Sequence, residues 1–197
     1  MSSSVIRAFI GVDLSPEIQH CLEQVSTQLK ERLEGDPVRW IPAENIHLTL
    51  KFLGDVSQAN LEMLKKILRA VVPSHPSFEI SVGGLGAYPK VHHPRVIWIG
   101  LEVPSDLVAI QHSIETETAR LGYAREERPF SPHLTLGRVS RNASPAEIHQ
   151  LGEVLDTFKV GFLGAARVRA IHLYRSDLKP GGAVYTRLFS VPLEGIS

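Results

Sequence analysis

Hydrophobic residues recur along the first half of the chain with two different spacings. Apolar positions three or four residues apart predict one helix after Ser15-Pro16 and a second after Ser57, each opened by a serine at the N-cap. Shorter apolar or alternating runs between them are typical of strands. The predicted strands of this half are 5–13, 38–41, 47–53 and 78–85.

The second half of the chain repeats this order of elements. One helix is expected after Pro104-Ser105, and another from residue 145 to about 155, where Ser144 and Glu147 have the spacing of a capping box. Residues 88–95 contain two prolines and are expected to form a short loop. The predicted strands are 96–101, 133–139, 158–163, 168–174 and 183–191, the last two separated by a turn at 180–182.

The repeated order is accompanied by a repeated sequence. Residues 9–16 resemble residues 98–105, and each stretch leads through a helix into His-Leu-Thr-Leu. We therefore expect one domain over 1–197 with an internal duplication, its copies at about 5–87 and 95–163, and C-terminal strands at 166–191 completing the sheets. The predicted fold class is α+β, with two pseudo-symmetric lobes, each an antiparallel sheet with flanking helices, around a central cleft.

The tetrapeptide His-Leu-Thr-Leu occurs at 47–50 and again at 133–136. In a strand, a period of two places the histidine and the threonine on one face and both leucines on the other. The alternation through 47–53 also predicts Lys51 on the polar face and Phe52 in the core. A duplicated packing motif would explain the leucines, but it gives no reason for the polar residues of both copies.

Two imidazoles that face each other across a cleft suit an in-line displacement at phosphorus. One neutral histidine takes the proton of an attacking water, while a protonated histidine on the far side donates to the departing oxygen. The hydroxyls of Thr49 and Thr135 can donate hydrogen bonds to the oxygens on which negative charge accumulates. An imidazole pKa of about 6.5 allows opposite protonation states near neutral pH. The scheme requires no metal.

Composition and charge narrow the class of protein. The chain has 197 residues, 21 Lys plus Arg against 21 Asp plus Glu, and 43% hydrophobic residues, which describes a globular domain rather than an unselective nucleic-acid coat. Between residues 120 and 187, however, 11 basic residues face 6 acidic ones. The single cysteine, Cys21, excludes an internal disulfide. No apolar run approaches the roughly 20 residues of a membrane span. We expect a cytoplasmic monomer without a membrane partner.

These motifs resemble the 2H phosphoesterases, which are defined by two His-x-Thr-x motifs. Among the 2H phosphoesterases, the sequence is similar to the RNA 2′,3′-cyclic phosphodiesterases, formerly called 2′-5′ RNA ligases. The resemblance implies the 2H phosphoesterase fold. The matching stretches are residues 7–14, 39–54, 96–100, 130–138 and 173–178, with Gly181 and Tyr185.

The resemblance implies hydrolysis of an RNA 2′,3′-cyclic phosphate end to a 2′-phosphate without a metal or cofactor. It also implies that His47 donates the proton to the leaving 3′ oxygen and that His133 accepts the proton of water, with Thr49 and Thr135 holding the phosphate. Arg138, three positions after the second threonine, would be a further phosphate ligand. Simple alternation places Arg138 on the face opposite His133, so this role needs a bend or bulge near Gly137.

The motifs are also compatible with two other functions. The same residues could catalyse RNA 2′-5′ ligation, in which a 5′-hydroxyl replaces water. The cleft could also serve a nucleotide-binding module with little turnover. The expected partners are RNA 3′ ends, tRNA fragments among them, or nucleotide 2′,3′-cyclic phosphates. The sequence identifies neither the RNA nor the base.

Overall fold

Four α-helices and nine strands make up residues 5–180 and 182–194, the part of the chain that the computed structural model describes. The helices are α1 (Pro16–Lys30), α2 (Gln58–Val71), α3 (Ser105–Arg120) and α4 (Pro145–Thr157), with short 3₁₀ helices η1 (Ala43–Asn45) and η2 (Val72–Ser74). The strands are β1 (Ile6–Val12), β2 (Val38–Trp40), β3 (Leu48–Val56), β4 (Phe78–Lys90), β5 (His93–Glu102), β6 (His133–Val139), β7 (Phe162–Val168), β8 (Ala170–Lys179) and β9 (Gly182–Pro192).

Serine caps open three of the four helices, as the sequence predicts. The side chains of Ser15, Ser57 and Ser144 accept hydrogen bonds from backbone N–H groups of the first turns of α1, α2 and α4. Glu147 completes the capping box by accepting the backbone N–H of Ser144. These caps satisfy donors that a helix start would otherwise leave unpaired.

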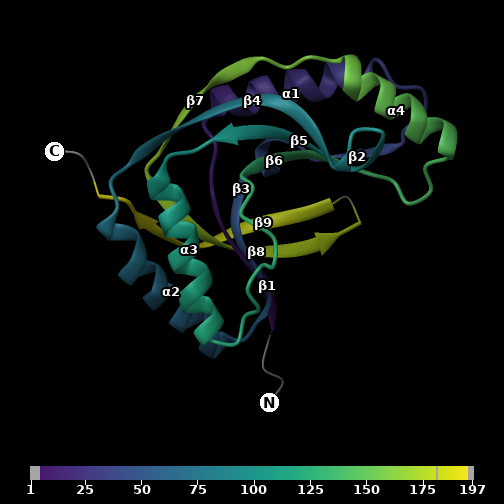
Figure 1. The fold of residues 1–197 in the computed structure, drawn as a ribbon. Coiled ribbons are helices and arrows are strands. Elements are labelled where there is room, and N and C mark those ends of the chain that lie inside the picture. Colours follow the sequence, from purple (N-terminus) through teal and green to yellow (C-terminus); the bar gives the residue numbers. More distant parts are fainter. Residues whose placement is uncertain (1–4, 181, 195–197) are drawn as a thin grey trace.

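The strands form one curled antiparallel sheet in the order β7-β4-β5-β6-β3-β1-β8-β9, with β2 pairing beside β6. The two halves of this order meet where Leu48 of β3 pairs with Leu134 of β6. Four strands on each side of that junction form the two lobes, which confirms the predicted α+β class with two lobes, although one continuous sheet runs through both (Figure 1).

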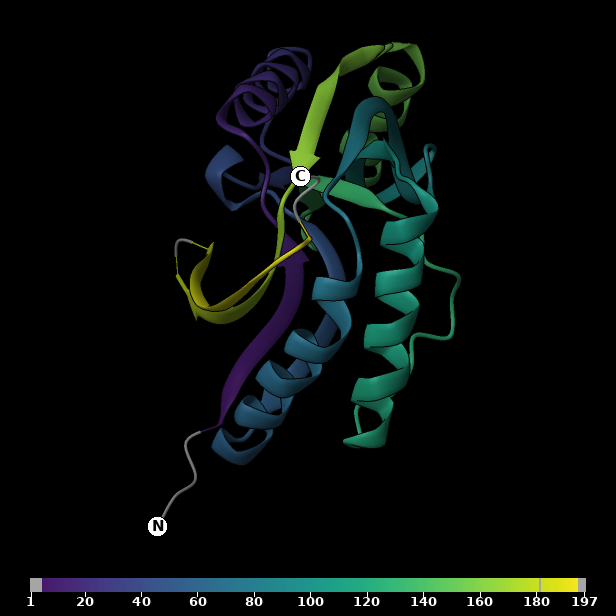
Figure 2. The same cartoon turned by 90° about the vertical axis from the view of Figure 1, so that its left-hand side faces the viewer.

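The helices are exchanged between the two lobes (Figure 1). α1 follows β1 in the chain, yet it packs against β7 in the other lobe, where α4 covers β4 and β5. α3 follows β5, yet it packs beside α2 and against β3. The pair α2 and α3 lies together in both views (Figure 2). Each lobe is therefore built from both halves of the chain. None of the described helices is long and apolar enough to cross a membrane.

The segment predicted as a loop at 88–95 is instead the end of a long hairpin, so that prediction is wrong. β4 continues to Lys90, and β5 begins at His93. Pro89 and Pro94 face each other next to a shift in the strand register. A proline cannot donate to the ladder, and such an irregularity is one place where a strand accommodates it.

The strands predicted at 158–163 and 168–174 have wrong boundaries. Phe158 closes α4, because its N–H donates to the carbonyl of Val154, and β7 begins only at Phe162. β7 ends at Val168, and β8 starts at Ala170. Phe158 is buried where the helix ends, so its apolar character serves that packing. Gly181 of the predicted turn lies outside the described residues.

Candidate active site

The two His-Leu-Thr-Leu motifs lie side by side where the lobes meet. All four leucines are at most 3% exposed, which confirms that they face the core. Since Leu48 pairs with Leu134 in antiparallel register, His47 comes opposite Thr135, and Thr49 comes opposite His133. The junction therefore brings the polar residues of both motifs onto one face, related by an approximate twofold.

Both histidines are held in the same orientation by the carbonyl two residues earlier. The Nδ1–H of His47 donates to the carbonyl of Asn45 at 2.8 Å, and the Nδ1–H of His133 donates to that of Ser131 at 2.7 Å. With the proton on Nδ1, each neutral ring keeps the lone pair of Nε2 for a reacting group. Either imidazole can then act as a base when neutral, or as an acid from Nε2 when protonated.

Aromatic rings surround His47. Phe9 of β1 stacks on the imidazole with 4.4 Å between ring centroids, and Tyr185 of β9 meets it edge-on at 5.0 Å. Burial lowers the pKa of His47 below its usual value, while the Asn45 carbonyl and the charge of Asp13 act in the opposite direction. In the free protein, its environment thus favours the neutral imidazole.

His133 has a corresponding aromatic neighbourhood in the second lobe. Tyr88 of β4 meets its ring edge-on with 5.2 Å between centroids, and Trp98 of β5 lies 6.3 Å away. The hydroxyl of Tyr88 is 2.8 Å from that of Ser131, the residue whose carbonyl orients His133. Phe9 and Trp98 occupy corresponding positions of the repeated sequence. Each lobe thus places an aromatic ring beside its histidine.

A bulge at Leu136 places Arg138 on the same face as His133. Trp98 pairs with Thr135 but Ile97 pairs with Gly137, so Leu136 is the extra residue. After a bulge of this kind the alternation shifts by one position. The chain therefore has the irregularity near Gly137 that Arg138 needs to face the site.

The first motif strand carries the same irregularity one residue after Thr49. Ile10 pairs with Lys51 but Gly11 pairs with Thr49, which leaves Leu50 as the extra residue. Lys51 consequently points into the core and is 5% exposed, whereas Phe52 is 66% exposed. The sequence prediction for these two side chains is therefore wrong. By the repeat, Phe52 occupies the position that corresponds to Arg138.

A cavity of about 390 Å³ adjoins His47 between β1, β8, β9 and η1. Asp13 lies at its wall and accepts hydrogen bonds from the hydroxyl of Tyr174 and from the guanidinium of Arg187. Burial and the hydrogen bond to Asp13 raise the pKa of the Tyr174 hydroxyl. His172 is buried beside them, with Nε2 3.7 Å from the Asp13 carboxylate. The cavity thus combines aromatic surface with fixed polar groups.

Among the described residues, no three histidine, cysteine or acidic side chains gather as a set of metal ligands. Comparison with known proteins identifies the family. The model described as LigT-like phosphoesterase matches twice, at residues 12–98 and 99–185. The chain belongs to the LigT-like phosphoesterase family.

Members of this LigT-like family with close similarity come from archaea and bacteria. An RNA 2′,3′-cyclic phosphodiesterase of Methanothermobacter thermautotrophicus is 34% identical over 92% of this chain and 95% of its own. One of Thermotoga maritima is 31% identical over 96% of this chain and 97% of its own. The crystal structure of Escherichia coli LigT with 3′-AMP is 25% identical, covers 96% of this chain and 99% of its own, and has a TM-score of 0.75.

The LigT-like fold brings together residues that the motifs alone did not identify. Phe9 and Trp98 belong to the sequence repeat, but nothing in their spacing predicts that they lie beside the histidines. The association of Asp13 with Tyr174 and Arg187 joins the two ends of the chain, so only the pairing of β1 with β8 and of β8 with β9 reveals it.

Proposed function

We propose that this chain hydrolyses RNA 2′,3′-cyclic phosphate ends to 2′-phosphates by two-histidine acid–base catalysis. The observation that carries the proposal is the pair of motif strands at the junction, with two imidazoles oriented alike on one face. The names of the curated relatives, which align over most of both chains, support the substrate class.

In the proposed reaction, Nε2 of neutral His133 takes a proton from water as the water oxygen attacks phosphorus. The bond between phosphorus and the 3′ oxygen breaks, and protonated His47 donates its Nε2 proton to that oxygen. The products are a 2′-phosphomonoester and a free 3′-hydroxyl. Negative charge on the substrate phosphate favours the protonated form of His47, opposing the effect of burial on its pKa.

Thr49, Thr135 and Arg138 are the proposed phosphate ligands. The two hydroxyls come opposite the two histidines in the motif register, so they border the position between the imidazoles. The bulge at Leu136 turns Arg138 to the same face, where its guanidinium can neutralise charge on the phosphate. These roles are supported by position and by the residue types that the chemistry requires.

The terminal nucleoside is proposed to lie on the side of His47. The departing 3′ oxygen belongs to the ribose, so the group that protonates it must face the nucleoside. A cavity of about 390 Å³ adjoins His47, and its size lies within the range of small-ligand pockets. Phe9 and Tyr185 offer aromatic surface there, on which a base of single-stranded RNA can stack.

The decisive experiment follows an oligonucleotide that ends in a 2′,3′-cyclic phosphate, with EDTA present. We expect His47→Ala and His133→Ala each to abolish formation of the 2′-phosphate, while both variants keep the circular dichroism of the parent. His112→Ala is the matched control, because His112 is exposed on α3 and outside the proposed site. Full turnover by either site variant would contradict the proposal.

A further inference from the structure

A second arginine lies directly opposite Arg138. In the short antiparallel pairing of β2 with β6, Arg39 is the register partner of Arg138. Side chains of directly opposed residues project from the same face, with about 4.5–5.5 Å between their Cα atoms. Both arginines are exposed. The two arginine side chains therefore project from the same face of neighbouring strands.

The neighbouring residues show that this shared face is the face of the catalytic motifs. Val38 is 1% exposed, and a Cβ on Gly137 would meet its side chain, so Val38 and Gly137 share the core face. Arg39, one residue from Val38, thus projects from the opposite face. On β5, Ile97 is buried, whereas Val96, the partner of Arg138, lies on the site face.

Neither arginine is neutralised by a neighbour in the described part of the chain. Within residues 5–180 and 182–194, no ion pair or side-chain hydrogen bond involves Arg39 or Arg138. Arg187, across the site, is by contrast paired with Asp13. Like charges in direct cross-strand register destabilise a sheet, so this pair costs stability in the free protein. Phosphate groups bound beside the two guanidinium groups would offset that cost.

We propose that Arg39 forms a second phosphate subsite, which binds the phosphodiester one nucleotide inward from the cyclic end while Arg138 binds the end itself. The inference rests on the proposed function and extends it to a polymeric substrate. The two arginines stand on neighbouring strands, so each can bind a different phosphate of one RNA strand. After Arg39 the chain leads into η1, whose Glu44 and Asn45 line the cavity beside His47.

The test compares a dinucleotide that ends in a 2′,3′-cyclic phosphate with the corresponding cyclic mononucleotide, which lacks the inner phosphodiester. We expect Arg39→Ala to lower kcat/KM for the dinucleotide at least tenfold more than for the mononucleotide, through KM. The slope of log kcat/KM against log salt concentration for the dinucleotide should become shallower by about 0.7, the value for one phosphate contact on a single strand. Arg39→Lys should retain most of that slope.

Arg95→Ala is the matched control. Arg95 is also an exposed arginine, but it is the residue next to Val96 in β5, so the alternation of the strand assigns it to the opposite face. It should leave the ratio of the two substrates unchanged. Equal losses on both substrates for Arg39→Ala, or no loss on either, would overturn the subsite. The melting temperature of Arg39→Ala without RNA should equal or exceed that of the parent, which separates lost binding from lost folding.

Binding of the reaction products tests the subsite without relying on turnover. Calorimetry compares a dinucleotide ending in a 2′-phosphate with the mononucleotide 2′-phosphate, using the parent and Arg39→Ala. Weaker binding of the dinucleotide alone supports the subsite even if the parent cleaves neither cyclic phosphate, a result that would refute only the proposed hydrolysis. Unchanged binding of the dinucleotide would refute the subsite.

Discussion

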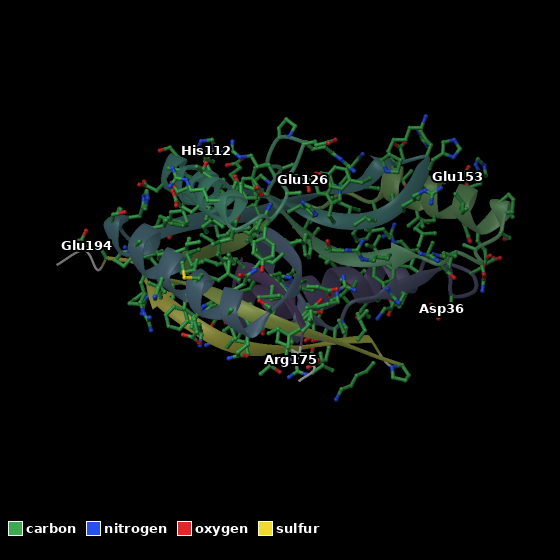
Figure 3. All side chains as sticks on the ribbon, turned by 90° about the horizontal axis from the view of Figure 1, so that it is seen from below. Asp36, His112, Glu126, Glu153, Arg175 and Glu194 are labelled. Atoms are coloured by element: carbon green, nitrogen blue, oxygen red, sulfur yellow. The ribbon has the colours of Figure 1, made fainter. Side chains whose placement is uncertain are left out.

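Replacing Lys51 by methionine should strongly destabilise the protein, because it removes one partner of a buried ion pair. The ammonium of Lys51 lies 2.7 Å from the Glu115 carboxylate, with the two side chains 4% and 12% exposed. It also donates to the carbonyl of Ala124. Glu115 in turn accepts the N–H of Glu126 and a hydrogen bond from Gln111. Glu126 lies in the loop next to α3, the helix that carries His112 (Figure 3).

The magnitude follows from the charge that remains. Removing one member of a buried pair typically costs about 3–5 kcal/mol, since the other charge stays buried without compensation. For a chain of this size that loss lowers the melting temperature by roughly 6–20 °C. Lys65→Met is the matched control, because Lys65 pairs with Glu62 at the surface of α2, where such pairs contribute less than about 0.5 kcal/mol.

The assay is urea unfolding of the parent, Lys51→Met, Glu115→Gln and the double variant. Glu115→Gln removes the negative charge that Lys51→Met leaves buried without a partner. The double variant should therefore be more stable than Lys51→Met alone, even though it carries one more substitution at the same site. Lys51→Met within 1 kcal/mol of the parent would refute the reasoning. A double variant that loses the sum of the two single losses would refute it as well.

Two further predictions concern pH and packing. Burial lowers the pKa values of His47 and His172, so near pH 6 these two side chains bind fewer protons in the folded state than in the unfolded state. The urea concentration at the unfolding midpoint should therefore fall as the pH drops from 7.5 to 5.5. This fall should be smaller in the double variant His47→Gln/His172→Gln. Gly86→Ala should cost about 1–3 kcal/mol and reduce kcat, because a Cβ there would come 2.3 Å from the Trp98 ring. Gly161→Ala, with no atom within 4 Å of the added Cβ, is its control, and equal unfolding midpoints for the two variants would contradict the argument.

Simple alternation along the two motif strands predicts the face of each side chain correctly up to the residue after each threonine. Beyond that residue, it predicts the wrong face. Thr49 and Thr135 precede the bulges, so simple alternation places them properly. Lys51, Phe52 and Arg138 follow the bulges, and there the faces are reversed. The extra residue is a buried leucine in both strands, indistinguishable in sequence from an ordinary inward-facing residue. Gly137, directly after Leu136, is the one sequence feature that indicates the bulge in β6. No glycine follows Leu50, so nothing in the sequence indicates the bulge in β3.

The other wrong predictions also arise because the structure depends on pairing between segments that are distant in the sequence. Two prolines at 88–95 favour a loop when read locally, but β4 and β5 tolerate them because they face each other at a register shift. The four helices follow from local periodicity, supported by serine caps at three of them, and the sequence predicts all four. The aromatic rings beside the histidines and the Asp13 cluster depend on which strands become neighbours, which local patterns do not encode.

The exchange of helices between the lobes has a consequence for synthesis of the chain. Ala8 in β1 pairs with Arg175 in β8, and α1 packs against β7, so β1 and α1 complete their packing only after β7 and β8 have been made. Contacts between segments so far apart in the sequence predict slow folding. Until β8 arrives, one edge of β1 is a template for pairing with another chain. Before the hairpin of β8 and β9 is made, the exchange between the lobes therefore favours pairing between copies of the chain.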